Sequence, residues 1–136
     1  MIRNIHIIII FFIYFKIIGQ DISPKNIEII RDDFGVPHIY AKTDKELAYG
    51  LAWAHSEDDF KTIQEAYLAG NSMLSKYIGL RAAPVDFLSQ LIQSEEIIDS
   101  LYNTIDDNFL KVVEGYAEGI NRYAELNPNE VLVKKL

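Results

Sequence analysis

The chain has 136 residues, no cysteine and a formal net charge of −7, with 49% hydrophobic and 24% charged residues. Such a composition is that of a globular protein, and the length suits one domain. An acidic surface repels phosphate backbones and anionic lipid heads, which argues against a nucleic-acid-binding protein. The lack of cysteine excludes disulfides and thiolate zinc sites from this sequence, but many exported proteins need no disulfide, so it does not decide the compartment.

Residues 1–19 are typical of a cleavable signal peptide. They carry Arg3 and Lys16 and no acidic residue, and residues 7–15 form an unbroken apolar run. That run is shorter than the roughly 20 apolar residues of a membrane span. A cut before Gln20 would leave a small residue at the −1 position. We therefore expect a periplasmic or secreted protein, with an uncleaved N-terminal anchor as the alternative.

A β-hairpin is predicted next. Residues 26–31 are β-branched and roughly alternating, which indicates a strand, and residues 36–41 indicate a second one. Residues 32–35 between them combine two aspartates with Gly35, as a turn requires. A two-stranded ribbon is barely stable alone, so we expect it to join a larger sheet.

A long first helix should begin at residues 43–46, whose Thr-x-x-Glu spacing is that of a capping box. Trp53, Phe60 and Tyr67 recur every seven residues and predict one stripe facing a core. Residues 70–71 interrupt the pattern, residues 72–78 can resume it, and Gly79 is placed to stop it.

Two more helices are predicted. Pro84 fits the first position of a second helix that runs to about Tyr102. A third begins at Asp106 or Asp107 and shows the clearest helical periodicity in the chain, through Phe109, Val112, Val113, Tyr116, Ile120 and Tyr123.

The third helix contains Gly115 and Gly119, four residues apart and so on one face. Each costs about 1 kcal/mol relative to alanine in a helix interior, so close packing against a neighbour is the expected compensation. Asn127-Pro128 should end this helix, and residues 130–136 begin a β-like run without a turn or polar tail. We expect a fragment of a longer protein or a truncated reading frame.

The stretch from Ala48 to Phe60 is unusual for a helix, because small residues alternate with aromatic ones and a His-Ser-Glu-Asp-Asp run follows. Small residues let another backbone come close, and clustered ionisable groups beside Trp53 suggest polar atoms held inside a packed structure. The stretch predicts a helix surrounded by more protein than this chain supplies.

His55, Glu57, Asp58 and Asp59 form the densest ionisable cluster. His55 and Asp59 are spaced i and i+4, so on a straight helix they could hold a metal ion or act as an orienter–base pair. The pattern is not H-E-x-x-H, and the sequence identifies no third ligand.

We favour a structural interpretation of that cluster. In it, Glu57 and Asp58 cap backbone groups or pair with Arg31, Arg81 or a partner chain, and His55 fills a semi-polar core site. Glycine fingerprints of phosphate and dinucleotide sites, and the G-x-S-x-G nucleophile motif, are absent from the sequence.

Two further residues are candidate catalytic groups. His38 could be a general base, but a lone histidine on a strand is more often packed and hydrogen-bonded. Ser56 follows His55 directly, and neighbouring side chains on a helix point apart, so the pair is no nucleophile signal. The residues themselves therefore assign no catalytic, cofactor-binding or metal-ligating position.

Three stretches resemble the penicillin acylase family. Residues 29–41 are similar to the family's I-x-R-D-x-x-G-V-P-H-I opening, residues 49–58 to its Y-G-x-G-x-A-x-A-x-D helix, and residues 116–123 to its Y-A-x-G-[IV]-N-x-[YF] helix. The resemblance runs from about residue 27 to the end. The Ser-Glu-Asp-Asp form favours the acyl-homoserine-lactone and aculeacin acylase branch. Ala52 departs from a common glycine, and Asp59-Phe60 from an Arg-Leu-type pair, so the subfamily and its acyl group stay open.

The resemblance implies an exported amidohydrolase with an N-terminal nucleophile and a four-layer αββα fold. The precursor would be cut into α and β chains, and the β-chain's first residue, usually serine, would attack the amide carbonyl. The fold class expected here is α+β: a hairpin and about three helices, with residues 20–136 the incomplete start of the α-chain. Its partners would be the remaining α-chain, the β-chain and a small N-acylated substrate. Some family members bind calcium, but no ligand set here matches.

None of those catalytic atoms corresponds to a position in this sequence, so the segment alone is expected to be inert. Two alternatives stay open: a complete exported helical interaction module without enzymatic activity, and a small metal site on His55.

Overall fold

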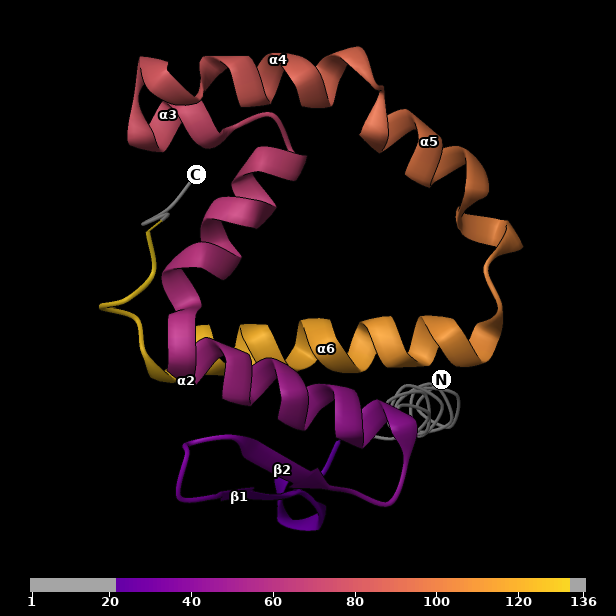
Figure 1. Cartoon of the computed structure of the whole chain (residues 1–136). Coiled ribbons are helices and arrows are strands. Elements are labelled where there is room, and N and C mark those ends of the chain that lie inside the picture. Colours follow the sequence, from indigo (N-terminus) through magenta and orange to yellow (C-terminus); the bar gives the residue numbers. More distant parts are fainter. Residues whose placement is uncertain (1–21, 133–136) are drawn as a thin grey trace, which may run out of the picture.

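The computed structural model of the chain describes residues 22–132; the predicted signal peptide lies outside them. The elements follow one another around an open frame (Figure 1). In chain order they are η1 (Pro24–Asn26), β1 (Glu28–Arg31), β2 (Pro37–Tyr40), α2 (Asp44–Gly70), α3 (Leu74–Ile78), η2 (Leu80–Ala82), α4 (Ala83–Leu91), α5 (Ser94–Leu101), η3 (Tyr102–Thr104) and α6 (Asp107–Leu126).

The predicted α+β class is confirmed: within residues 22–132, helices accompany a single two-stranded antiparallel sheet. Strands β1 and β2 pair with Ile29 opposite Ile39. The turn between them is built by Asp32, whose Oδ1 accepts hydrogen bonds from the backbone N–H groups of Phe34 and Val36, both at 2.9 Å. Gly35 has a φ of 81°, which a residue with a Cβ rarely adopts.

Helix α2 begins as predicted. Thr43 is its N-cap, and the Thr43 hydroxyl accepts a hydrogen bond from the backbone N–H of Glu46 at 3.2 Å. The carboxylate of Glu46 is fixed in turn by the side chain of Asn26 at 3.0 Å, which joins the cap to the segment before β1. These hydrogen bonds to the charged form hold the pKa of Glu46 below its ordinary value.

The small residues of α2 are explained by two neighbours, one on each side of the helix. The hairpin covers one side, where a Cβ on Gly50 would lie 2.8 Å from the side chains of Ile27 and Ile39. Helix α6 covers the other, where a Cβ on Gly119 would lie 2.5 Å from the carbonyl oxygen of Tyr49. The hairpin, the first half of α2 and α6 form three layers (Figure 1). The small residues therefore find their packing partners within this chain.

The close contact of α6 with α2 confirms the structural role predicted for its glycines. Gly115 packs onto the backbone of Lys45 as Gly119 packs onto that of Tyr49. Beside them, the ammonium of Lys45 pairs with the carboxylate of Glu118 at 2.7 Å. Asp106 caps α6 as predicted: its side chain accepts the N–H groups of Asn108 and Phe109.

The stripe predicted along the first helix is wrong beyond Phe60. Asp59 has non-helical angles (φ −158°, ψ 68°), so α2 is two helices joined at a kink. Phe60 is buried, but Tyr67 is 67% exposed, because the kink turns the second half of the helix away from the stripe's axis.

The predicted second helix, from Pro84 to about Tyr102, is also two helices. α4 ends at Leu91 and α5 starts at Ser94, because Gln93 lies in the left-handed region (φ 54°) and redirects the chain. The stop predicted at Gly79 is confirmed: it follows α3 with a φ of 87°.

The second half of α2 and helices α3, α4 and α5 form what we call the arm. Its small core gathers Leu68, Leu74 and Ala82. The buried carboxylate of Asp86 ties α4 to α3 by accepting the N–H groups of Leu74 and Ser75, at 2.9 and 2.8 Å.

The β-like run predicted for residues 130–136 lies partly outside the described residues. Where it is described, Glu130 belongs to a turn and residues 131–132 are not in a strand. Among the helices of residues 22–132, none combines the length and apolar character needed to cross a membrane.

Candidate functional site

The ionisable cluster on α2 is organised by Arg31, the last residue of β1. Its guanidinium lies 2.8 Å from the carboxylate of Asp58 and 3.3 Å from that of Glu57. It also donates to the carbonyl oxygens of Gly35 at 2.9 Å and Ala54 at 3.4 Å. The hydrogen bonds that Arg31 donates to Asp58 and Glu57 raise the pKa of Arg31. The predicted pairing with Arg31 is confirmed, and the arrangement fastens the hairpin to α2.

The cluster is not held inside a packed structure, as its composition had suggested. His55, Glu57, Asp58 and Asp59 are all exposed. The expectation that His55 fills a core site is therefore wrong. Its Nδ1 lies 3.1 Å from the hydroxyl of Tyr116 on α6, an exposed contact.

His55 and Asp59 do not form the pair that helical spacing would give. The kink places Asp59 in an extended conformation, and its carboxylate caps the second half of α2 through the N–H and the hydroxyl of Thr62, at 3.0 and 2.7 Å. These bonds keep the pKa of Asp59 below its ordinary value. Within residues 22–132, no group of three or more histidine, cysteine or carboxylate side chains is placed to hold a metal ion.

The other two candidate catalytic residues, His38 and Ser56, also have local partners. Nε2 of His38 lies 3.3 Å from Oδ2 of Asp32, across the turn of the hairpin. The hydroxyl of Ser56 is buried and donates to the carbonyl oxygen of Ala52 at 2.7 Å. The structure thus brings His38, Ser56 and His55 to three different places, and no two of them face each other.

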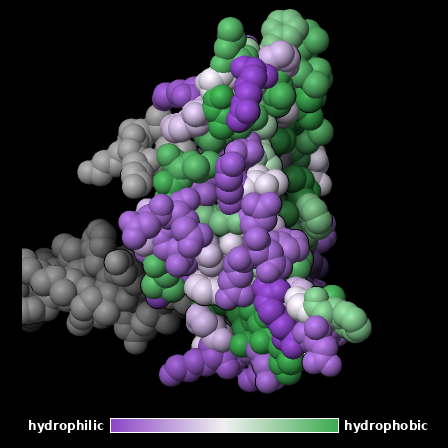
Figure 2. All heavy atoms as spheres, turned by 60° about the vertical axis from the view of Figure 1, so that its left-hand side comes forward, coloured by the Kyte–Doolittle hydropathy of each residue, from purple (hydrophilic) through white to green (hydrophobic). Residues whose placement is uncertain are grey.

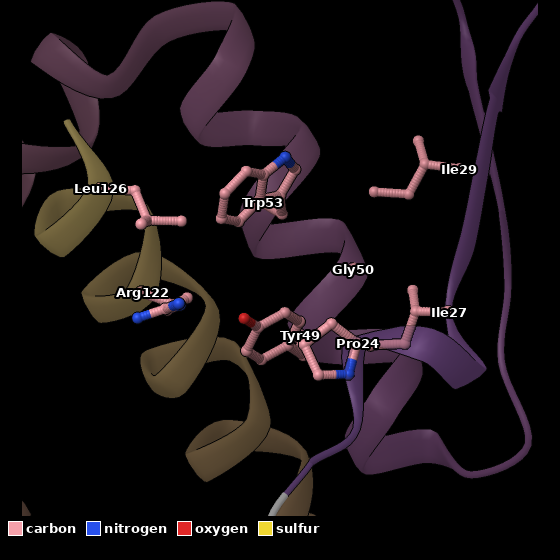
Figure 3. A pocket seen from close by; sticks show the side chains of 8 residues that line it. All are labelled: Pro24, Ile27, Ile29, Tyr49, Gly50, Trp53, Arg122 and Leu126. Atoms are coloured by element: carbon pink, nitrogen blue, oxygen red, sulfur yellow. The ribbon is translucent and has the colours of Figure 1, made fainter.

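One groove was missed by the sequence reasoning. It has a volume of about 290 Å³ and lies where β1, the first half of α2 and the end of α6 meet (Figure 3). Pro24, Ile27 and Ile29 line it from the hairpin side, and the remaining lining residues are Tyr49, Gly50, Trp53, Arg122 and Leu126. The spacing of Ile27 and Ile29 indicates that both lie on one face of the strand. It does not indicate that α2 would cover only part of that face.

The groove is apolar with one cation. Burial raises the pKa of Tyr49, so its hydroxyl stays neutral at ordinary pH. The guanidinium of Arg122 is engaged with the carboxylate of Glu125 at 2.9 Å. The indole N–H of Trp53 donates to Glu57 at 2.8 Å. These groups can pack an apolar segment, but they offer neither a nucleophile nor a general base.

A larger exposed apolar surface lies on the arm. Phe87, Leu88, Leu91, Ile92, Ile98 and Leu101 are each more than half exposed. Figure 2 shows hydrophobic side chains gathered at the top, where α3 and α4 lie, and along one edge. In the sequence these residues recur at roughly helical spacing, as on one apolar face. The face exists, and the described residues leave it uncovered.

Comparisons with known proteins identify the family of this chain. The family model for penicillin amidase matches residues 26–133. The chain belongs to that family. The match includes the hairpin, the kinked helix and α6, the three places where the sequence resembles the family.

Similarity to individual acylases supports this family assignment. The chain is 27% identical over 123 residues to an acyl-homoserine lactone acylase PvdQ of Pseudomonas fluorescens, a match covering 82% of this chain and 16% of the relative. It is 24% identical over 116 residues to a penicillin G acylase of Escherichia coli, covering 83% and 14% of the two chains. The chain therefore spans about a sixth of the length of the curated relatives it matches.

The fold also has a solved counterpart. A thermostable penicillin G acylase from Alcaligenes faecalis matches with a TM-score of 0.67 at 22% identity, covering 76% of this chain and 55% of the matched chain. At that identity the match supports the fold alone, and it confirms that the hairpin and helices form part of the penicillin acylase architecture.

Proposed function

We propose that this chain is the N-terminal part of an exported acylase that hydrolyses the amide bond of a small N-acylated molecule. The observation that carries the proposal is the family match over residues 26–133, combined with coverage of only 16% of an acyl-homoserine lactone acylase. In this proposal the segment is scaffold and is inert alone. The nucleophile is the first residue of a β-chain formed by cleavage of a longer precursor, its own α-amino group acting as base.

The uncovered surfaces support a scaffold role. A monomeric soluble protein rarely exposes a large contiguous apolar patch, and a larger one marks an interaction surface. We propose that the rest of the α-chain and the β-chain cover the apolar side chains of α4 and α5.

The substrate is proposed to carry an acyl group on an amide nitrogen, as in an acyl-homoserine lactone, a β-lactam or a lipopeptide. We rank the acyl-homoserine lactone first, because the Ser56–Asp59 sequence resembles that branch and several relatives bear that name. The proposal places the mature protein in the periplasm or outside the cell, on the strength of residues 1–19. Calcium remains a proposal for the whole protein only.

The test compares three preparations: the purified chain alone, the full precursor expressed from the gene that encodes this chain, and the precursor with alanine at the first residue of its β-chain. Each is incubated with an N-acyl homoserine lactone and with penicillin G, and release of the free amine is followed by mass spectrometry. We expect release only by the unmodified precursor. Amide cleavage by the chain alone would refute the scaffold role, and a gene without a serine-, threonine- or cysteine-led β-chain would refute the acylase.

Export is tested separately. Residues 1–30 fused to alkaline phosphatase should give a phosphatase that is active in the periplasm, since that enzyme requires oxidising conditions. Mass spectrometry of the exported fusion should place its N-terminus at Gln20. Activity confined to the membrane fraction with an intact N-terminus would favour the uncleaved anchor.

A further inference from the structure

The segment that follows α6 turns back beside the arm. In Figure 1 the trace leaves the end of α6 and rises past the second half of α2. Asn127 ends the helix, and a turn closes with a hydrogen bond from the N–H of Glu130 to the carbonyl oxygen of Asn127 at 3.0 Å. The hydroxyl of Tyr123 then donates to the carboxylate of Glu130 at 3.2 Å. We call residues 127–132 the strap.

One side chain of α2 holds the strap by its backbone. Nε2 of Gln64 donates to the carbonyl oxygen of Glu130 at 3.1 Å, and Oε1 of Gln64 accepts from the backbone N–H of Leu132 at 2.7 Å. In a parallel ladder, a residue bonds in the same way to the two residues that flank its partner. The amide of Gln64 therefore takes the place of one strand residue opposite Val131.

The orientation of that amide is fixed by its surroundings. Its nitrogen also lies 3.3 Å from the carbonyl oxygen of Phe60, one turn earlier on α2. Two carbonyl oxygens face Nε2 and one N–H faces Oε1, so only one orientation satisfies all three groups. A carboxylate at this position would accept from Leu132 but would turn an oxygen toward the carbonyl of Glu130.

The position of Gln64 on α2 determines which parts of the chain its hydrogen bonds connect. It lies five residues after the kink at Asp59, on the half of α2 that belongs to the arm. The half before the kink packs on α6, and the strap is the continuation of α6. The Gln64 hydrogen bonds therefore connect the second half of α2 to the strap, and the strap continues from α6, which packs on the first half of α2. Phe60, whose ring centroid lies 5.0 Å from that of Tyr123, packs against α6 next to the kink.

We infer that Gln64 is a positioning residue: by binding the strap's backbone it fixes the angle of the α2 kink, and with it the place of the arm relative to α6. Without that clamp, the capped break at Asp59 leaves the arm free to pivot. This inference concerns the chain's own geometry and does not depend on the proposed acylase activity.

A titratable replacement tests the inference. Glutamate at position 64 is isosteric with glutamine, and when protonated it has one O–H donor and one acceptor, as the clamp requires. We therefore expect Gln64→Glu to lose the clamp at about pH 7 and to regain it below its ordinary pKa of about 4.3. The charged groups nearby are Glu130 on the strap, which accepts a hydrogen bond from the neutral Tyr123, and the Lys61–Glu65 pair on α2. Wild-type protein at each pH accounts for their titration.

Two measurements report the clamp and the arm separately. The protection factor of the Leu132 amide, measured by NMR hydrogen exchange, should fall about tenfold in Gln64→Leu, the size expected for losing one such hydrogen bond. The chain has no cysteine, so spin labels can be placed at Glu95 on α5 and Ala117 on α6 through two introduced cysteines. The distance distribution between them should broaden in Gln64→Leu, and in Gln64→Glu at neutral pH only.

The matched control is Gln90→Glu, the same change at an exposed glutamine of α4. It should leave the Leu132 protection and the label distance at their wild-type values. An unchanged distance distribution in Gln64→Leu would overturn the positioning role, even if Leu132 loses protection. A Gln64→Glu variant that behaves alike at both pH values would overturn the donor–acceptor clamp.

Discussion

The layered body of the molecule (hairpin, first half of α2, and α6) and the arm differ in how closely their elements pack. In the body, backbones approach so closely that a Cβ on Gly119 would lie 2.5 Å from a carbonyl oxygen. In the arm, Phe87 and Leu91 are each 65% exposed, although their spacing is that of a core-facing stripe. The close contacts of the body are made within this chain, whereas the described residues leave the apolar face of the arm uncovered. Family membership shows most clearly in the body, where all three motifs lie.

The largest expected effect comes from filling the body's closest contact. Gly119→Leu puts a side chain where the backbone of Tyr49 and the Cβ of Ala52 already lie, and backbone cannot move aside cheaply. Overpacking of this kind typically costs 1–3 kcal/mol, and we expect about 3 kcal/mol here. Urea unfolding followed by circular dichroism measures it.

The control is Gly70→Ala, at the end of α2, where a Cβ would meet nothing within 4 Å. Replacing glycine by alanine in an open helical position stabilises by up to about 1 kcal/mol. The two variants should therefore shift the unfolding midpoint in opposite directions. An unchanged unfolding midpoint in Gly119→Leu would mean that α6 does not pack on α2 as described.

This contrast also separates what the sequence could predict from what it could not. The cap at Thr43, the turn at Gly35 and the close approach at Gly119 follow from local chemistry, and all three are confirmed. The kink at Asp59 and the break at Gln93 could not be predicted, because neither position carries proline or glycine. At the kink, the carboxylate of Asp59 caps the second half of α2 through Thr62, and Gln64 binds the strap one turn later.

The ionisable cluster shows the same limit for the candidate site. The sequence offered Arg31, Arg81 or a partner chain as partners for Glu57 and Asp58, and the structure shows that Arg31 is the partner. Whether the cluster is inside or outside depends on which faces of α2 the hairpin and α6 cover. That is a property of three elements at once, so His55 was wrongly expected in the core.

A smaller effect is expected from the one polar tie inside the arm. Asp86→Asn turns an amide N–H₂ toward one of two backbone donors, so either Leu74 or Ser75 loses its acceptor. The melting temperature at neutral pH should fall, by less than in Gly119→Leu, because the arm's core is small. Differential scanning calorimetry measures this change.

The stability that the Asp86 hydrogen bonds contribute should decrease in acid. Hydrogen bonds from Ser75 and Leu74 hold the pKa of Asp86 below its ordinary 3.8. A carboxyl group with a lowered folded pKa contributes stability above its unfolded pKa and loses it as the pH falls through the folded value. The wild-type advantage over Asp86→Asn should therefore persist from neutral pH to about 4 and shrink below 3.8. An advantage that grows in acid would contradict the assignment.

The exposed ion pairs of Arg31 should matter less. Arg31→Gln removes the charge that fastens the hairpin to Glu57 and Asp58, while a short donor remains for the carbonyl of Gly35. Surface pairs are weak and are screened by salt. We expect a modest fall in melting temperature at low ionic strength that disappears in about 1 M salt, where the Debye length is about 3 Å. A deficit independent of salt would mean that the hydrogen bonds to Gly35 and Ala54 dominate.

The smallest effect on the chain, and the most informative about the arm, should come from Phe87→Ser. Phe87 is already 65% exposed, so losing its ring should change the free energy of unfolding of the isolated chain by no more than about 0.5 kcal/mol. The same change should reduce self-association of the chain, measured by sedimentation velocity, because it interrupts the exposed apolar face. In the full precursor, covering that ring by the remaining polypeptide would make Phe87→Ser destabilising by about 2 kcal/mol. Equal effects in the chain and the precursor would show that the arm's apolar face stays open to solvent in both, and that the remaining polypeptide does not cover it.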